Sequence, residues 1–460
     1  MANRQGKQYE IDMCNGPILS RMLRFSIPLM CSSVLQLLFN AADIVVVGRW
    51  AGDNSLAAVG SNTALIGLLT NLFVGLAVGA NTLAAKYYGA HDQEELRKTV
   101  HTSMLLSLIS GLILTVVGVV GARTILIWMQ TPANVLDLAT LYLRIYFLGM
   151  TATMVYNFGA ALLRAGGDTQ RPLYFLSLAG VVNIVLNLFF VIVCHLAAAG
   201  VALASIISQY ISAALVILSL RRSGSVVRLE RSMLRIEPHK AKQVLSLSIP
   251  AGLQNAIFAI ANLFIQAGVN SFDELMVEGN AAAANADALV YDVMAAIYTA
   301  CSSFMSQNYG AGKRKRIIHS YFISMAFSFG IALVMSALLV IFGRQFLALF
   351  TTESAVIDAG MKRVGVMALA YCISAFMDCT IAASRGLGKT VVPTVIVIMG
   401  SCVFRVIWVY TIFAHFHTIP SLYLLYPCSW ALTAIAEILY FIRCYKQAMK
   451  IFREPIPSSL

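Results

Sequence analysis

Apolar segments long enough to cross a lipid bilayer follow one another along almost the whole chain. A bilayer core takes roughly 20 residues of helix, and a helix satisfies its backbone hydrogen bonds within one segment. Only 12% of the residues are charged, whereas a soluble domain carries about a quarter charged residues. The two-residue alternation of an outer-membrane barrel is absent. The sequence therefore predicts an all-α integral membrane protein.

The hydropathy pattern predicts twelve transmembrane helices of similar length. Their expected bounds are 18–48, 56–84, 99–126, 134–162, 171–194, 198–220, 244–270, 281–307, 317–345, 357–383, 391–415 and 420–443. The polar start of the chain has no cleavable signal pattern, so we expect it to be retained.

Basic residues gather on alternate connecting segments of this arrangement. If the N-terminus is cytoplasmic, most of the 33 Lys and Arg residues fall on the cytoplasmic side. The outer loops then hold only Arg49, Arg123 and Arg344. This asymmetry is what the positive-inside rule predicts for two cytoplasmic termini in a cell (inner) membrane. The net charge of +12 is explained by topology and does not indicate nucleic-acid binding.

Two halves of the chain repeat one another at a fixed offset. "RFSIP" ends at Pro28 and "SLSIP" at Pro250, and "KYYGA" contains Gly89 where "QNYGAGKRKR" contains Gly310. The two prolines are 222 residues apart and the two glycines 221, and "LLRAGGDTQRP" and "AASRGLGKTVVP" again differ by 221. A spacing held over so much of the chain indicates two copies of a six-helix unit, related by an axis along the membrane normal.

The repeat predicts two pseudo-symmetric six-helix lobes around a central cleft, which is a transporter architecture. The expected parts are a cytoplasmic N-terminal segment 1–17, an N-terminal lobe 18–220, a cytoplasmic linker 221–243, a C-terminal lobe 244–443 and a cytoplasmic tail 444–460. The basic linker fits either a solvated connection or a short amphipathic helix on the membrane surface.

No enzyme motif is present. "GLGKT" at 386–390 lacks the upstream glycine of a phosphate-binding loop, and neither a nucleophile elbow nor HExxH occurs. The nine cysteines include no CxxC pair and show no metal spacing. We expect no cofactor, so transport energy must come from an ion gradient or from a separate partner.

One face of the first span is polar. Gln36, Asn40 and Asp43 occur at spacings of four and three residues in an otherwise apolar helix. Ionisable side chains inside spans almost always face the bundle interior or a wet cavity. A carboxylate there can carry a proton, and with neighbouring oxygens it can bind a hard cation such as Na⁺. Asp43 is therefore the leading candidate for ion coupling.

Two further spans offer polar side chains to the same site. Asn183 and Asn187 are one helical turn apart in the fifth span, and Ser205 lies in the sixth. If these spans meet the first, one pocket forms around Asp43, with a Na⁺ site at Asp43, Asn183 and Asn187 as one interpretation. The alternative is that each amide merely bonds between helices, which is worth about 0.6 kcal/mol.

The second lobe repeats the amides but lacks the acid. With the offset of 222, Asn40 corresponds to Asn262 while Asp43 corresponds to Ile265. Asn255 continues the amide stripe of the seventh span, and both asparagines are candidates for the substrate cleft. An ion site confined to one lobe would produce this asymmetry.

Other polar and aromatic groups in the spans are candidates for binding substrate. Asp378 is expected to pair with Arg405, and the alternative is cation binding. Asp287 and Asp292 lie toward the outer side of the eighth span, where either could line the cleft mouth. Tyr146 and Met150 could offer adaptable surface to organic cations, although ordinary helix packing would also explain them.

The motifs together resemble one known family. "NAADIVVVG", "LLRAGGDTQRP", "SQNYGAGKRKRI" and "RGLGKTVVP", in this order and spacing, are similar to the multidrug and toxic compound extrusion (MATE) family of bacterial type. The resemblance covers nearly the whole chain. It implies a V-shaped cleft between two lobes and export of organic, often cationic, compounds against inward flow of H⁺ or Na⁺.

The resemblance also assigns residues. Asp43 matches the family's aspartate in the first span, and Asn183 matches the asparagine of an N-x-x-x-D pattern whose aspartate is replaced here by Asn187. A glutamate that one branch carries in the seventh span is missing near Phe258. These departures leave the coupling ion open.

The sequence thus predicts a secondary active antiporter for drugs and other toxic compounds that works by alternating access, coupled to H⁺ or Na⁺. The expected partners are small organic cations and membrane lipids, without nucleic acid, and the expected state is a monomer. The alternatives are a lipid-linked oligosaccharide flippase of the same superfamily, which usually has more spans, and a channel or receptor.

Overall fold

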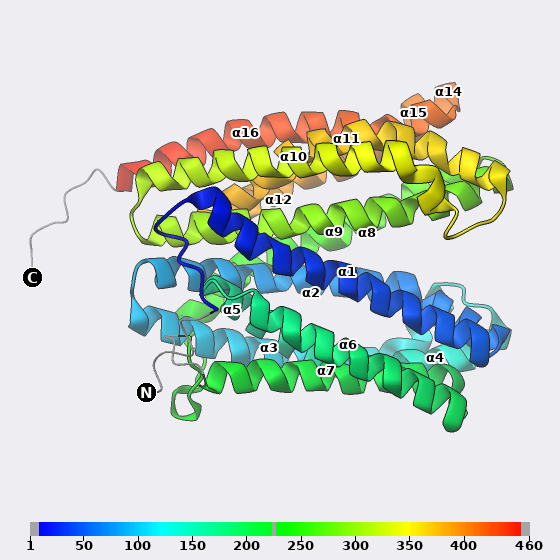
Figure 1. The fold of residues 1–460 in the computed structure, drawn as a ribbon, viewed down its shortest axis with the longest axis horizontal. Helices are drawn as coiled ribbons and strands as arrows, with labels where there is room; N and C mark the ends of the chain where they lie inside the picture. Colours follow the sequence, from blue (N-terminus) through cyan, green and yellow to red (C-terminus); the bar gives the residue numbers. More distant parts are fainter. Residues whose placement is uncertain (1–8, 223–226, 452–460) are drawn as a thin grey trace, which may run out of the picture. The chain divides into compact units, whose positions relative to one another are not determined.

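The computed structural model describes residues 9–222 and 227–451, and their regular elements are all helical (Figure 1). Eleven of these helices are long and apolar enough to cross a membrane, and one bent pair of shorter helices passes the same test when taken together. The prediction of an all-α membrane protein with about twelve spans is confirmed.

The first half of the sequence forms seven α-helices and one π-helical turn. They are α1 (Ile18–Trp50), α2 (Asp53–Gly89), α3 (Gln93–Trp128), α4 (Ala133–Leu148), α5 (Met150–Ala165), α6 (Gln170–Leu188), the π turn η2 (Phe189–Val193) and α7 (Ala197–Arg222). The predicted span 134–162 is the bent pair α4 and α5, which meet at 42°. The bend falls at Gly149, where an added Cβ would lie 2.5 Å from Gln209 Oε1.

The second half repeats this plan with a more broken eleventh span. Its long helices are α8 (Pro238–Val269), α9 (Glu274–Gly310), α10 (Arg314–Leu347), α11 (Ser354–Gly386) and α16 (Leu425–Ile451). Between the last two lie α12 (Val391–Val397), η4 (Ile398–Val403), α13 (Phe404–Trp408), η5 (Val409–Phe413), α14 (Ala414–Phe416) and α15 (Ile419–Tyr423). The π turns η2 and η5 fall at corresponding places in the two halves.

The chain divides into two compact units whose bounds mirror one another. The first unit contains the described residues of Met1–Asp12 and Ile27–Ser248, and the second those of Met13–Ser26 and Ile249–Leu460. Ser26 and Ser248 each precede a proline inside a helix by two positions, Pro28 in α1 and Pro250 in α8. The start of α1 thus belongs to the second unit, and the start of α8 belongs to the first.

Close packing fixes these two helix starts in their units. In the second unit Phe25 packs edge-on against Phe304, with ring centroids 6.1 Å apart. In the first unit Gly79 lets α2 approach α8, because a Cβ at residue 79 would lie 2.3 Å from Ser248 Oγ. The lobe bounds expected from the repeat, 18–220 and 244–443, do not include this exchange.

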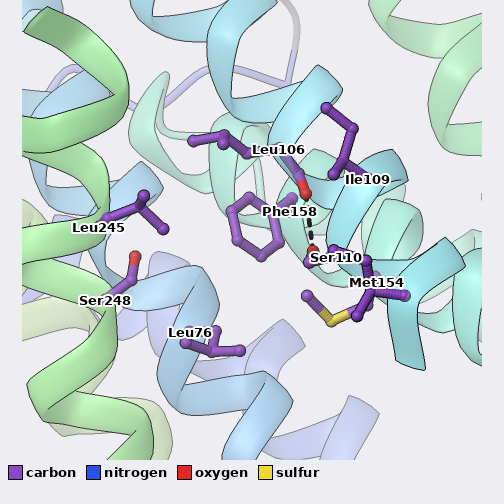
Figure 2. Close-up of a pocket in the computed structure, with 9 residues that line it drawn as sticks. Leu76, Leu106, Ile109, Ser110, Met154, Phe158, Leu245 and Ser248 are labelled. Carbon is purple, nitrogen blue, oxygen red and sulfur yellow. Dashed lines mark hydrogen bonds between the residues drawn. The ribbon is translucent and has the colours of Figure 1, made fainter. Parts of the chain in front are cut away.

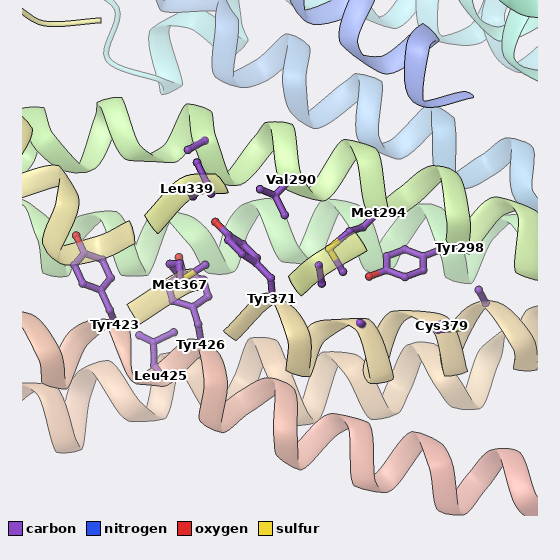
Figure 3. Packing of buried hydrophobic residues seen from close by; sticks show 14 of the residues in the cluster. Val290, Met294, Tyr298, Leu339, Met367, Tyr371, Cys379, Tyr423, Leu425 and Tyr426 are labelled. Carbon is purple, nitrogen blue, oxygen red and sulfur yellow. The ribbon is translucent and has the colours of Figure 1, made fainter. Parts of the chain in front are cut away.

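The second unit is built around α9 and α11. These helices pack against each other, α10 packs against both, and α16 packs along α11 (Figure 1). Their shared core includes Val290, Met294, Met367 and Tyr371 (Figure 3). Of their most apolar segments 61% is buried, against 11% for α1, the least buried of the candidate spans.

The described part of the linker is held against the start of α3. The backbone N–H of Glu230 donates to His101 Nε2 at 2.9 Å, and that of Glu237 donates to Thr102 Oγ1 at 3.2 Å. Between 227 and 237 the only helical element is the 3₁₀ turn η3 (Arg231–Met233). The amphipathic surface helix considered for the linker is therefore not formed in these residues; 223–226 lie outside the described residues. The cytoplasmic placement of 1–17, 221–243 and 444–460 stays a prediction.

Candidate functional site

Asp43 lies at the end of a chain of side-chain hydrogen bonds that links three helices of the first unit. The Asn187 amide on α6 donates to Asp43 Oδ1 on α1 and, at 3.2 Å, to Asn183 Oδ1. The Asn183 amide in turn donates to Ser205 Oγ on α7 at 3.4 Å. The spans expected to meet around Asp43 do meet there, and they bring these four predicted residues together.

This cluster contains fewer hydrogen-bond donors than acceptors, so one buried acceptor is left without a partner among the described residues. Asn183, Asn187 and Ser205 are buried, and Asp43 is half-buried. Both amide hydrogens of Asn187 are engaged, yet its Oδ1 is buried and has no hydrogen-bond partner among the described residues. A carboxylate and an unpartnered amide oxygen, side by side in a dry environment, are stabilised by a proton or a cation. The cluster can therefore bind either.

The local sequence explains how α6 comes close to α1. An added Cβ at Gly180 would lie 1.9 Å from the ring of Phe39, which is one turn before Asp43. With a side chain at residue 180, the ring of Phe39 would have to move for the helices to keep this approach. The π turn η2 begins two residues after Asn187, and such turns re-aim the side chains around them and occur often at functional sites.

Two members of the predicted polar face do not join the cluster. Gln36 and Asn40 are exposed, and neither makes a side-chain hydrogen bond to Asp43 among the described residues. A spacing of three residues turns a side chain by about 60° from its starting direction on a helix. Asn40 therefore lies on the neighbouring stripe of α1, and the expectation that both amides line the pocket of Asp43 is wrong for this structure.

The substrate candidates of the first unit lie deeper than expected. Tyr146 is half-buried and stacks against the buried Tyr142, with ring centroids 6.3 Å apart. Met150 belongs to the hydrophobic core and is only 1% exposed. A substrate could reach Met150 only after the surrounding side chains have moved.

The candidates on α8 and α9 differ in their surroundings. Asn262 is exposed and Asn255 is half-buried. Asp292 is half-buried and forms no ion pair or hydrogen bond with another described residue, so it remains available to a ligand. Ile265, which corresponds to Asp43 in the repeat, is buried in the core of the second unit.

A buried ion pair that the sequence did not predict joins α9 to α11. Arg363 contacts Asp287 Oδ2 through two nitrogens, at 2.9 and 2.5 Å, and donates to Asn280 Oδ1. The hydroxyl of Tyr371 donates to the other Asp287 oxygen, and that of Tyr423 donates to Asn280. The charges are neutralised and bonded on several sides, so this network is structural. The signal available in the sequence was an acid in the eighth predicted span and an arginine in the tenth.

The expected ion pair between Asp378 and Arg405 is not formed. The guanidinium of Arg405 is buried, donates from its Nε to the hydroxyl oxygen of Ser429 at 3.1 Å, and lies 4.7 Å from the ring centroid of Tyr426. Phe258 and Trp430 also face it. Aromatic faces stabilise a cation in place of a carboxylate, which leaves Asp378 half-buried without a salt bridge.

An apolar cavity of about 220 Å³ lies elsewhere in the first unit (Figure 2). It is lined by Leu76, Leu106, Ile109, Ser110, Ile113, Met154, Phe158, Leu245 and Ser248. Ser110 is already bonded to the carbonyl of Leu106 at 2.6 Å. None of the predicted site residues lines this cavity, so it is distinct from the cluster at Asp43.

The fold and the repeat agree with a family model that matches the chain twice. The model, described as MatE, covers residues 28–189 and 250–411, which are copies shifted by 222 residues. The chain belongs to the MatE family. This membership confirms the resemblance seen in the sequence, and because the family consists of ion-coupled transporters, it also confirms that the protein is not an enzyme.

Bacterial relatives of this MatE chain are described by different functions. It is 26% identical over 382 residues to the probable multidrug resistance protein YoeA of Bacillus subtilis, covering 82% of each chain. It is 23% identical over 368 residues to the FAD transporter of Shewanella oneidensis, covering 78% of this chain and 80% of that protein.

Solved MATE structures share the fold. A structure described as the outward-facing conformation of a multidrug resistance MATE family transporter superposes with a TM-score of 0.89 at 23% identity, over 97% of this chain and 100% of that one. A MATE structure in complex with MaL6 gives 0.90 at 23% identity, over 96% and 100%. The predicted fold class is thereby confirmed.

Two departures from the family pattern have structural consequences in this MatE chain. Asn187, in place of an aspartate, still binds Asp43 and adds the unpartnered oxygen. Phe258, near the position of a glutamate in one branch, packs 5.4 Å from the guanidinium of Arg405. No group of three His, Cys, Asp or Glu side chains within 9–222 and 227–451 could hold a metal ion, so any Na⁺ site would consist mainly of amide and hydroxyl oxygens.

Proposed function

We propose that this MatE transporter is a secondary active antiporter that exports organic, cationic compounds in exchange for H⁺ or Na⁺, with Asp43 as the ion-coupling residue. The observation that carries the proposal is the half-buried Asp43 carboxylate beside the unpartnered oxygen of Asn187. An ionisable group inside a span is costly unless it has a function, and this one sits in a cluster that a proton or cation would complete.

Alternating access links the ion to the substrate. Each ligand shifts the balance between inward- and outward-open states only by its differential affinity for them. A proton entering down one pH unit supplies about 1.4 kcal/mol, and one charge crossing 100 mV supplies about 2.3 kcal/mol. Exchange of one proton for one monovalent cation uses the pH difference alone. Export of a neutral compound would use both terms.

The proposed cationic substrates rest on the acids of the spans. Asp43, Asp292 and Asp378 are half-buried and lack a salt bridge among the described residues. Unpaired carboxylates favour cationic ligands, and Tyr146 adds an aromatic face. The description of YoeA as a probable multidrug resistance protein supports the same class, whereas the FAD transporter is a relative described with a different substrate.

The proposed setting is a bacterial cell membrane, with both termini cytoplasmic and the chain acting as a monomer. The excess of Lys and Arg on alternate connections supports this orientation. Protease accessibility of tags at the two termini in sealed right-side-out and inverted vesicles tests it directly.

The test of the function is substrate uptake into inverted membrane vesicles. Ethidium, a fluorescent organic cation, is followed while the pH gradient and the Na⁺ gradient are collapsed separately. We expect accumulation that stops when one of them is removed, and that gradient names the ion. Vesicles without the protein are the control.

The outcomes separate the alternatives. Ethidium uptake that is unchanged when the pH gradient and the Na⁺ gradient are each collapsed would contradict coupled antiport and favour a channel. No uptake of ethidium or of other organic cations, together with movement of a lipid-linked oligosaccharide across the bilayer, would favour a flippase.

A further inference from the structure

A fully buried carboxylate without a hydrogen-bond partner among the described residues lies in the second unit, on the last long helix. Glu437 on α16 is 0% exposed, and neither of its carboxylate oxygens has a hydrogen-bond partner among the described residues. A buried charge without a partner is among the costliest groups a protein can hold. The acid must therefore be protonated, or charged beside a cation, in each state of the transporter.

Glu437 lies between two levels of α16, one turn before it and one turn after it, at which the helix contacts other helices. One turn before it, Thr433 hydrogen-bonds Ser401 on η4, with 2.9 Å between the hydroxyls. One turn after it, Phe441 packs on Tyr321 of α10, with ring centroids 4.4 Å apart. Glu437 is thus held inside the helix bundle of the second unit and cannot turn to solvent without disturbing both levels.

The charged groups that act on Glu437 come from α11. Arg385 and Asp378 are the two whose electrostatic fields reach it, and Arg385 is held by Gln254 through one nitrogen at 2.9 Å. Arg385 Nε is buried and has no partner among the described residues. Arg385 therefore has a free donor near two acids, Asp378 and Glu437. Neither acid forms a salt bridge with Arg385 in this structure.

Other titratable groups face α16 from the elements packed against it. They include Arg363 and Tyr371 on α11, Tyr321 on α10, Arg405 on α13 and Tyr423 on α15, with Tyr426, Tyr440 and Cys444 on α16 itself and Lys389 in the connection before α12. Arg363 is already paired with Asp287. Arg405 is already held by aromatic faces. Arg385 is therefore the cation in position to compensate an ionised Glu437.

Glu437 and Asp378 both lie in the field of Arg385, and Asp378 also lies in that of Arg405. A negative charge on either acid makes ionisation of the other less favourable. Interacting acids of this kind take up and release their protons as a coupled set. Such a set can change its proton content when the helices that carry it shift.

We propose that Glu437 is a second proton-carrying residue of the transporter, in the unit that lacks the counterpart of Asp43. In one state the Glu437 carboxyl holds the proton. In the other it gives the proton to water, and Arg385 is the cation that stabilises the carboxylate. The proposal rests on the proposed antiport only for its role in transport; the titration of Glu437 stands independently.

The direct test is infrared spectroscopy of the full chain in lipid nanodiscs over a pH titration. Protonated carboxyl groups absorb separately from carboxylates, so each titrating acid contributes a band that changes with pH. We expect the wild type to show two such bands. One should be missing from the spectrum of Glu437→Gln, and the other from that of Asp43→Asn. Asp137→Asn, which removes an exposed acid paired with Arg123, is the matched control and should keep both.

The spectra decide between a carrier and a fixed neutral acid. A band of Glu437 that stays constant over the titration, or a Glu437→Gln spectrum equal to the wild type, overturns the proposal. If Glu437→Gln does not fold, Glu437→Asp keeps the carboxyl and should show a shifted band, whose absence has the same meaning. If instead the band assigned to Asp43 does not change with pH, the result counts against Asp43 as the proton-coupling residue of the proposed antiporter.

A transport measurement then tests the role. In proteoliposomes the number of protons exchanged per substrate molecule should fall in Glu437→Gln while Asp137→Asn keeps the wild-type ratio. A titrating Glu437 with an unchanged ratio would show that the acid is not a carrier and overturn that part of the proposal.

Discussion

At the scale of single residues, the protein handles its buried charges in two ways. Asp287 and Arg363 neutralise each other and are bonded on several sides. Asp43, Asp378 and Glu437 have no salt bridge among the described residues. The first arrangement stabilises the fold, whereas the second leaves acids that an ion or proton can complete, at a cost in stability.

Replacement of Asn187 should weaken ion binding more than replacement of Asn40. Asn187→Ala removes the donor to Asp43 and the free oxygen beside it, whereas Asn40→Ala changes an exposed amide on the same helix as Asp43. A hydrogen bond to a charged group is worth about 1.5–3 kcal/mol, so we expect the half-saturating ion concentration to rise at least about tenfold in Asn187→Ala. Ion titrations of ethidium transport measure it. Equal effects of both substitutions would contradict the geometry.

Breaking the ion pair between α9 and α11 should destabilise the protein. Arg363→Met leaves the Asp287 carboxylate buried without its cation, which costs about 3–5 kcal/mol. The prediction is a lower midpoint of thermal unfolding in detergent, partly restored when Asp287→Leu is added. Were the single variant as stable as the wild type, the pair would not support the fold.

At the scale of elements, α1 is the helix best suited to move. Its most apolar segment is the least buried of the candidate spans, and its contact with α6 depends on the missing side chain of Gly180. Proline at residue 28 removes one backbone donor inside the helix, and its ring crowds the preceding turn. A loosely packed helix that carries Asp43 can respond to the binding of an ion.

Enlarging residue 180 should separate α1 from α6. Gly180→Leu places atoms where the ring of Phe39 now lies, so we expect Asp43 to lose its contact with Asn187 and ion-dependent transport to decline. Adding Phe39→Ala makes room again and should recover part of the activity. Transport assays of the two single variants and the double variant check this, and a Gly180→Leu protein with full activity would refute the packing argument.

At the scale of the whole molecule, each compact unit includes the first turns of a long helix from the other half of the sequence. The breaks after Ser26 and Ser248 stand at equivalent positions before two prolines. The two halves of the sequence therefore share the fold and also this exchange of helix starts between the units. This arrangement connects the units through two continuous helices, α1 and α8.

The sequence predicted the helices and the core of the ion cluster because both depend on local spacing. Asn183 and Asn187 are one turn apart, so their helix had to present them together to a neighbour. The exchange of helix starts, the aromatic surroundings of Arg405 and the burial of Glu437 depend on tertiary packing. Glu437 was still detectable as an acid in the last span, and a survey of every intramembrane acid would have found it.

The most direct test of ion coupling at Asp43 compares two modes of transport in proteoliposomes containing the wild type or Asp43→Asn. One mode is ethidium accumulation driven by the coupling gradient, and the other is exchange of labelled for unlabelled ethidium without a gradient. The account predicts that Asp43→Asn, at normal protein levels, loses gradient-driven accumulation, since its amide cannot carry the proton or bind the cation as a carboxylate does. Gradient-driven accumulation by Asp43→Asn at the wild-type rate would contradict it.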